Sequence, residues 1–248
     1  SYLMLVPTMG VALLEHPDID RYDVASLIAV LMGAAPTPVW AWRSLKEKLG
    51  LAEVFTGYGM TELTSATTFT APDDPLEMVA ATVGRPLDAG VAGIAHLEGV
   101  VAEYKTIDPL TSADLPAGAE GELCARGPTA TSGYFAKPKE TSELLLPDGW
   151  VRSGDLGRIR PDGYLELTGR SKELYKSGGE LVSPKEVEEL LTAHDAVAQA
   201  YVVGVPDDRW GEIGCAWIVK APGASVEEAE LIELAKGRLA RFKVPKRV

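Results

Sequence analysis

The stretch Thr56-Gly57-Tyr58-Gly59-Met60-Thr61-Glu62 places an aromatic ring between two glycines and follows it with a hydroxyl and a carboxylate. These groups suit a purine base, an α-phosphate and a divalent cation, because glycine lets the backbone approach a ligand closely and carboxylates bind Mg²⁺. The stretch therefore predicts a nucleotide site. Taken alone, a tyrosine between glycines is more often a turn, so the prediction depends on the surrounding sequence.

Residues 24 to 62 read as one parallel βαβ unit. The apolar run Leu27–Met32 ends at Gly33 and indicates a strand covered on both faces, and Glu53–Phe55 resumes as a strand. In such a unit the loops after the strands lie at one edge of the sheet. We therefore expect Gly33-Ala34-Ala35-Pro36 and the loop Gly57-Tyr58-Gly59 to lie side by side.

A helix is expected between these two strands. Pro38 is suited to open it, and Gly50 follows its expected end. The side chains expected on one side of this helix are those of Trp40, Leu45 and Leu49.

Two further styles of sequence follow. Residues 83–169 contain short alternating stretches that indicate an antiparallel barrel or sheet, and residues 170–248 indicate a small α+β domain. The predicted fold is thus α/β for residues 1–82, β-barrel for 83–169 and α+β for 170–248. The strands expected are Glu122–Arg126, Leu156–Arg160, Tyr164–Thr168, Gln199–Val205 and Gly214–Val219, and the capping boxes expected at helix starts are Ser183 to Glu186, with Pro184, and Ser225 to Glu228.

Charge and composition exclude several classes of function. With 24 Lys and Arg against 36 Asp and Glu, the net charge of −12 disfavours nucleic acid as a partner. The longest apolar stretch, Val24 to Met32, is about half of what a bilayer span requires, so we expect no membrane span and a cytoplasmic location. The cysteines and histidines have neither disulfide nor zinc-site spacing: Cys124, Cys215, His16, His96 and His194.

Two more motifs follow the first in order, namely Trp150-Val151-Arg152-Ser153-Gly154-Asp155-Leu156 and Thr168-Gly169-Arg170-Ser171-Lys172. With all three, the chain resembles the adenylate-forming enzymes, the superfamily of acyl-CoA synthetases, luciferase-type enzymes and peptide-synthetase adenylation domains. The resemblance covers nearly the whole chain. It implies the later part of a large domain followed by a small, mobile carboxy-terminal domain.

The resemblance also implies roles in binding ATP or AMP. Tyr58 would stack on adenine, Thr61 would donate to the α-phosphate, and Glu62 would hold Mg²⁺. Asp155 would accept the ribose hydroxyls, and Arg170 would reach the ribose or phosphate. The backbone implied to line the nucleotide belongs to Gly33, Ala34, Ala35, Pro36, Gly57, Gly59 and Met60.

A second set of residues is implied to serve a second half-reaction. Lys172 falls on the position of the family's hinge, where the small domain rotates between two orientations. The loop Ser177-Gly178-Gly179-Glu180 would approach the pantetheine arm of CoA, with Lys176 facing the active site.

The implied activity is that of an acid:CoA ligase: a carboxylic acid and ATP form an acyl-adenylate and pyrophosphate, and CoA then displaces AMP. The phosphate-binding loop and the carboxy-terminal lysine of the family have no counterpart here, so we expect a missing N-terminal half or partner chain and little activity alone. Two alternatives stay open. One is a carrier-protein-loading adenylation domain, and the other is a noncatalytic nucleotide-binding or assembly module.

Overall fold

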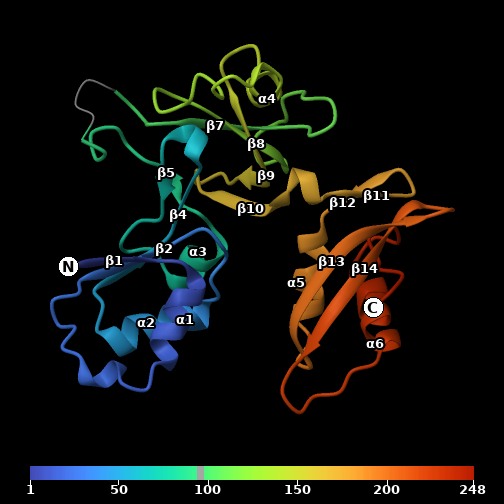
Figure 1. Cartoon of the computed structure of the whole chain (residues 1–248), viewed down its shortest axis with the longest axis horizontal. Coiled ribbons are helices and arrows are strands. Elements are labelled where there is room, and N and C mark those ends of the chain that lie inside the picture. The colour runs from blue at the N-terminus through green and yellow to red at the C-terminus, as the bar shows by residue number, and fades with distance from the viewer. Residues whose placement is uncertain (94–97) are drawn as a thin grey trace. The chain divides into compact units, whose positions relative to one another are not determined.

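The structure is a computed structural model that describes residues 1–93 and 98–248 (Figure 1). His96 lies outside the described residues. The chain divides into two compact units, one formed by residues 1–153 and 157–167, the other by residues 154–156 and 168–248. The three-part division expected from the sequence stays a prediction.

The first unit begins with a parallel sheet in the order β1-β2-β3. Its strands are β1 (Tyr2–Leu5), β2 (Ala29–Met32) and β3 (Glu53–Phe55), and its helices are α1 (Pro7–Glu15) and α2 (Val39–Leu49). Both strands expected around the helix are present, and they pair in the parallel sense that the βαβ reading requires.

Helix α2 starts directly after Pro38 and ends at Gly50, whose φ of 64° is left-handed and whose N–H donates to carbonyls of the last turn. Its buried side chains are those of Ala41, Trp42, Leu45 and Leu49. The expectation that Trp40 shares the face of Leu45 is wrong, because Trp40 is exposed. Five residues of helix turn through about 500°, which places Trp40 roughly 140° away from Leu45.

A second sheet of this unit has the order β4-β5-β6. Its strands are β4 (Gly57–Gly59), β5 (Ala66–Phe69) and β6 (Arg85–Pro86), accompanied by the 3₁₀ turn η2 (Thr61–Leu63) and helix α3 (Leu76–Ala81). The expected loop at Gly57–Gly59 is therefore a strand. Its two glycines permit that close pairing, because a Cβ on Gly57 would lie 2.5 Å from the carbonyl oxygen of Thr68, and one on Gly59 would lie 2.0 Å from that of Ser65.

A four-stranded sheet follows in the order β10-β9-β8-β7, with β7 and β8 antiparallel. The strands are β7 (Glu103–Ile107), β8 (Gly121–Arg126), β9 (Val151–Ile159) and β10 (Leu165–Arg170), and helix α4 (Pro138–Leu144) lies between β8 and β9 in sequence. Each of the three strands expected here overlaps an observed one. The antiparallel style predicted for this part of the chain is thus present.

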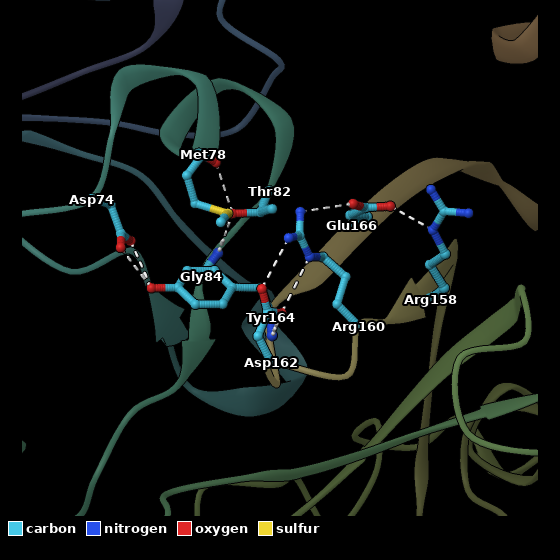
Figure 2. A network of polar contacts seen from close by, with 9 residues as sticks. All are labelled: Asp74, Met78, Thr82, Gly84, Arg158, Arg160, Asp162, Tyr164 and Glu166. Atoms are coloured by element: carbon cyan, nitrogen blue, oxygen red, sulfur yellow. Dashed lines mark hydrogen bonds and ion pairs between the residues drawn. The ribbon is translucent and has the colours of Figure 1, made fainter.

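A polar network fixes the β9–β10 hairpin to the segment around α3 (Figure 2). The hydroxyl of Tyr164 lies 2.7 and 2.8 Å from the two carboxylate oxygens of Asp74, and the Arg85 guanidinium lies 5.0 Å from the centre of the same ring. Burial, together with the hydrogen bond to Asp74, raises the pKa of Tyr164. The hairpin itself carries the ion pairs Arg160–Asp162, Arg160–Glu166 and Arg158–Glu166.

The second unit is a small α+β domain with the sheet order β12-β11-β14-β13. Its elements are η3 (Ser171–Glu173), β11 (Tyr175–Ser177), β12 (Glu180–Val182), α5 (Pro184–Thr192), β13 (Val197–Asp207), β14 (Gly211–Lys220) and α6 (Glu228–Arg238). Helix α5 packs on β13 and against α6, and the two helices share one core with the long β13–β14 ribbon (Figure 1). Apolar side chains from both helices, including Leu191 and Leu231, form the core.

The helix starts in this unit differ from the capping boxes expected. Ser183 does precede α5, with Pro184 at its first position, but its hydroxyl donates to the carbonyl of Thr168 at 3.1 Å instead of capping the helix. Helix α6 begins at Glu228 and not near Ser225. The residue before it, Glu227, is extended and stands at the N-cap, and Val226 is buried in the core.

No helix in the described part of the chain is both long and apolar enough to cross a membrane.

Candidate active site

The end of β2 and the start of β4 meet in the first unit. A Cβ on Gly33 would lie only 3.6 Å from the carbonyl oxygen of Gly57. Ala34 follows with a left-handed φ of 72°, which turns the chain sharply before Pro36. The structure therefore brings together the two segments that the sequence predicted to converge.

Tyr58 is largely buried in β4, with 8% of its surface exposed. Its N–H donates to the hydroxyl of Thr68 at 3.2 Å, and its ring centre lies 6.4 Å from that of Tyr104 with a 56° tilt. Strand pairing and this aromatic contact hold the ring in place. A base could therefore stack only on the small part of Tyr58 that remains accessible.

The turn η2 carries the hydroxyl and carboxylate of the first motif. Met60 is extended, and Leu63 is fully buried against Ala125 and Val151, which anchors the turn. Thr61 is exposed and Glu62 is half-buried. The turn thus leaves both polar groups accessible to a ligand while its apolar residue fixes the backbone.

Glu62 has a partner that the sequence did not predict. The hydroxyl of Tyr134, 72 positions further along the chain, donates to Oε1 of Glu62 at 2.5 Å. This hydrogen bond favours the protonated phenol and, with a smaller effect of burial, raises the pKa of Tyr134. No local pattern in the sequence links these two residues.

The donor set around η2 fits Mg²⁺ bound through a nucleotide. The described residues contain no cluster of three or more His, Cys, Asp or Glu side chains suited to hold a metal ion alone. Mg²⁺ commonly uses one or two carboxylates together with substrate phosphates and water. A single accessible carboxylate at Glu62, next to the Thr61 hydroxyl, is compatible with that arrangement.

A second polar group lies in the second unit, where Asp155 of β9 and Arg170 of β10 form an ion pair with 2.8 Å between Oδ1 and Nε. The Asp155 side chain is buried, whereas that of Arg170 is 61% exposed. Gly154 has a φ of 72°, and its carbonyl accepts a hydrogen bond from Ser171 at 3.1 Å. Asp155 and Arg170, which come from two different motifs, are therefore joined within one unit.

The hinge candidate Lys172 lies in η3, immediately after Arg170, and is exposed. Lys176 is also exposed and lies in β11, where its backbone N–H donates to Oε2 of Glu212 at 2.8 Å. Both lysine side chains are therefore accessible, and strand β11, which carries Lys176, pairs with β14.

Gly178 and Gly179 form the two-residue turn between β11 and β12. Their φ values of 62° and 93° suit a hairpin turn that side chains disfavour. A Cβ on Gly178 would lie 2.7 Å from Cε3 of Trp210, so the turn is packed against that ring. Glu180 is exposed, but Ser177 is buried, and its hydroxyl has no hydrogen-bond partner among the residues that the structure describes.

Comparison with protein-family models identifies both parts of the chain. The model described as AMP-binding enzyme matches residues 1–135, more than half of the chain, and the model described as AMP-binding enzyme C-terminal domain matches residues 186–248. The chain belongs to the AMP-binding enzyme family. The resemblance inferred from the motifs is therefore confirmed.

Curated relatives of this AMP-binding enzyme chain include acid:CoA ligases. A methyl-dioxo-octahydro-indenyl propanoyl:CoA ligase of Rhodococcus jostii is 36% identical over 242 residues, which are 98% of this chain and 42% of that protein. The mitochondrial medium-chain acyl-CoA ligase of Macaca fascicularis is 33% identical over 99% of this chain and 38% of its own length. The chain thus spans about two fifths of the length of these relatives.

The fold of the AMP-binding enzyme chain is also found in solved structures. The crystal structure of ATP-bound MatB from Rhodopseudomonas palustris matches with a TM-score of 0.82 and 33% identity, over 100% of this chain and 46% of that one. The expected fold, part of a large domain followed by a small C-terminal domain, is confirmed by this match.

The predicted site residues of this AMP-binding enzyme lie in separate local groups. The first unit holds Gly33–Pro36 together with Gly57–Glu62, and the second holds the Asp155–Arg170 pair and, further along, residues 172–180. Sequence reasoning missed Tyr134, which contacts Glu62, and did not link Trp210 to Gly178. Neither residue stands next to its partner in the sequence.

Proposed function

We propose that this chain carries the adenylate-handling residues of an acid:CoA ligase. In the first half-reaction a carboxylate oxygen of the acid attacks the α-phosphorus of ATP, and pyrophosphate leaves with the electron pair of the broken P–O bond. In the second, the thiolate of CoA attacks the acyl carbon of the adenylate, and AMP leaves. The two CoA ligases among the relatives support this choice of reaction.

The observation that carries the proposal is the Asp155–Arg170 pair. A buried carboxylate is an acceptor for both hydroxyls of a ribose, and a guanidinium is a donor for the adjacent phosphate. Their contact across 2.8 Å orients Asp155 while leaving most of Arg170 exposed to a ligand. An ion pair of this kind is suited to recognise a nucleoside monophosphate.

In the first unit, we assign Thr61 the role of hydroxyl donor to the α-phosphate and Glu62 that of the Mg²⁺ ligand. When bound, Mg²⁺ supplies charge that offsets the repulsion between the attacking carboxylate and the triphosphate. The backbone of Gly33–Pro36 meets β4 and has the small side chains that would admit a base or an acyl chain. These residues bind and orient, and the exposed Thr61 hydroxyl is available to donate.

For the second half-reaction, we assign Lys172 the role of the hinge. We assign the Gly178–Gly179 turn the role of contacting the pantetheine arm of CoA. The left-handed turn presents backbone without side chains, which suits a narrow thiol-bearing arm. Exposed Lys176 and Glu180 flank this turn, so they are placed to contact the same arm.

The test is acid-dependent exchange of labelled pyrophosphate into ATP, measured on the product of the complete reading frame that contains these residues. Addition of CoA should then release AMP and form a thioester. Exchange without thioester formation would favour a carrier-protein-loading adenylation domain. Absence of exchange with a broad panel of carboxylic acids, despite measurable nucleotide binding, would favour a noncatalytic nucleotide-binding module and contradict the proposal.

A further inference from the structure

The contact between Tyr134 and Glu62 joins two segments that are distant in sequence. The phenol donates to Oε1 of Glu62 at 2.5 Å, and about 40% of the tyrosine is exposed. Glu62 is half-buried in η2. Their side chains therefore meet at the surface, where a nucleotide and its cation can also approach.

The loop that carries Tyr134 packs against helix α4. The N–H of Tyr134 donates to the Thr141 hydroxyl at 2.9 Å. Gly133 has a φ of 132°, and a Cβ at this position would lie 2.5 Å from Cγ2 of Thr141. The glycine thus lets the loop lie directly against α4, which fixes the position from which the tyrosine reaches Glu62.

Backbone contacts hold the same loop to η2. The N–H of Thr131 donates to the carbonyl of Glu62 at 2.7 Å, and the hydroxyl of Thr64 donates to the carbonyl of Thr129 at 2.8 Å. These two bonds do not involve the Tyr134 side chain. The loop would therefore stay attached to the turn if the phenolic hydroxyl alone were removed.

A metal site with one protein carboxylate depends on the orientation of that carboxylate. Mg²⁺ requires near-ideal octahedral geometry, and residues that hydrogen-bond a metal ligand typically change metal affinity by about 10 to 100-fold when removed. A carboxylate has about four acceptor positions, so one hydrogen bond to Oε1 leaves capacity for a cation. The tyrosine can thus orient the Glu62 carboxylate and still leave acceptor positions free for a cation.

We propose that Tyr134 is a positioning residue that holds the Glu62 carboxylate in the orientation that receives the nucleotide-bound divalent cation. This inference rests on the proposed function. Tyr134 acts through Glu62 and does not itself contact the reacting atoms. The donor is the phenolic O–H, so phenylalanine at this position keeps the ring and loses only the orienting bond.

The test uses Mn²⁺ as the probe, with electron paramagnetic resonance to measure free Mn²⁺ during titration of the complete reading-frame product at saturating ATP. Tyr134→Phe should raise the dissociation constant for Mn²⁺ by about 10 to 100-fold. ATP binding measured in EDTA should change by less than about twofold, because the nucleotide contacts of the protein are untouched. Tyr22→Phe, which removes the hydroxyl of a largely exposed tyrosine of the same unit, is the matched control.

A double substitution separates positioning from folding. If Tyr134 acts through Glu62, Tyr134→Phe in a Glu62→Gln background should weaken Mn²⁺ binding no further. Unchanged Mn²⁺ affinity in Tyr134→Phe, with a loss in Glu62→Gln, would overturn the inference and leave the proposed function intact. Equal losses of Mn²⁺ and of metal-free ATP binding in Tyr134→Phe would also overturn it. A wild-type protein that binds no ATP at all would instead contradict the proposed function, and this inference with it.

Discussion

Asp155 and Arg170 are in contact across 2.8 Å, yet the carboxylate is buried and the guanidinium is mostly exposed. This difference in burial decides the effect of replacing Asp155. Removal of Asp155 leaves Arg170 with access to water, so no buried charge loses its partner. Loss of function and loss of stability can therefore be separated at this pair.

Asp155→Ala is expected to weaken ATP binding by about 10 to 150-fold, because a hydrogen bond to a charged group contributes roughly 1.5 to 3 kcal/mol. Recognition of the acid should change less. Calorimetric titration with ATP and with the acid measures the two effects. Asp148→Ala, at an exposed turn carboxylate, is the control, and equal nucleotide affinities of the two variants would make Asp155 a structural residue only.

Lys172→Pro is expected to separate the two half-reactions. Proline fixes φ near −65° in η3, where rotation of the small domain would have to be absorbed. Adenylation should survive within about tenfold, while thioester formation from preformed acyl-adenylate should fall by orders of magnitude. Single-turnover kinetics of each half-reaction measures this, with Lys172→Ala as the control for loss of the side chain. A parallel fall in both half-reactions would place Lys172 in the adenylation site or in the structural framework.

Elements with strong local signals could be predicted from the sequence. Pro38 and Gly50 mark the start and end of α2, because one removes a backbone donor and the other permits a left-handed φ. Pro184 likewise stands at the first position of α5. The expectation that Trp40 lies on the same side as Leu45 and Leu49 was wrong for a local reason, because helical spacing alone separates Trp40 from Leu45 by roughly 140°.

The candidate site was predictable only where its residues are close together in sequence or share a motif. Gly57–Gly59 looked like a loop because its strand partner, β5, lies beyond the turn η2. The contact of Tyr134 with Glu62 spans 72 positions and depends on how α4 and η2 pack. Such contacts arise from tertiary packing, so no local pattern in a single sequence predicts them.

Arg152→Ala is expected to destabilise the first unit by about 3 to 5 kcal/mol, because Glu122 is only 2% exposed and would lose its ionic partner. The Arg152 guanidinium donates to both carboxylate oxygens of Glu122, and these contacts raise the pKa of Arg152. Urea unfolding measures the change.

The matched control for this substitution is Lys139→Ala, which breaks an exposed pair with Glu143 and should cost less than about 1 kcal/mol. Similar losses in the two variants would show that the Glu122 carboxylate does not need Arg152. In that case the ion pair would contribute no more than a surface one.

Tyr175→Phe is expected to remove a pH-dependent loss of stability from the second unit. Burial, with the nearby carboxylates of Glu186 and Glu212, raises the pKa of Tyr175 to about 12, and its hydroxyl has no hydrogen-bond partner within the described part of the chain. An unfolded tyrosine loses its proton near pH 10. The tyrosine's contribution to stability is therefore complete below pH 10 and is lost as the pH rises toward 12, by up to about 1.4 kcal/mol per pH unit.

Urea unfolding at pH 9 and pH 11 measures this effect. At pH 9 the Tyr175→Phe variant should match or slightly exceed the wild type, because an unpaired buried hydroxyl costs free energy. At pH 11 it should be more stable than the wild type by about 1 kcal/mol. Tyr201→Phe, at an exposed tyrosine of the same sheet, should show no such difference between the two pH values. If the free energies of unfolding of wild type and Tyr175→Phe stay parallel from pH 9 to pH 11, the Tyr175 hydroxyl ionises as readily in the folded chain as in the unfolded one, and its burial has no influence on alkaline stability.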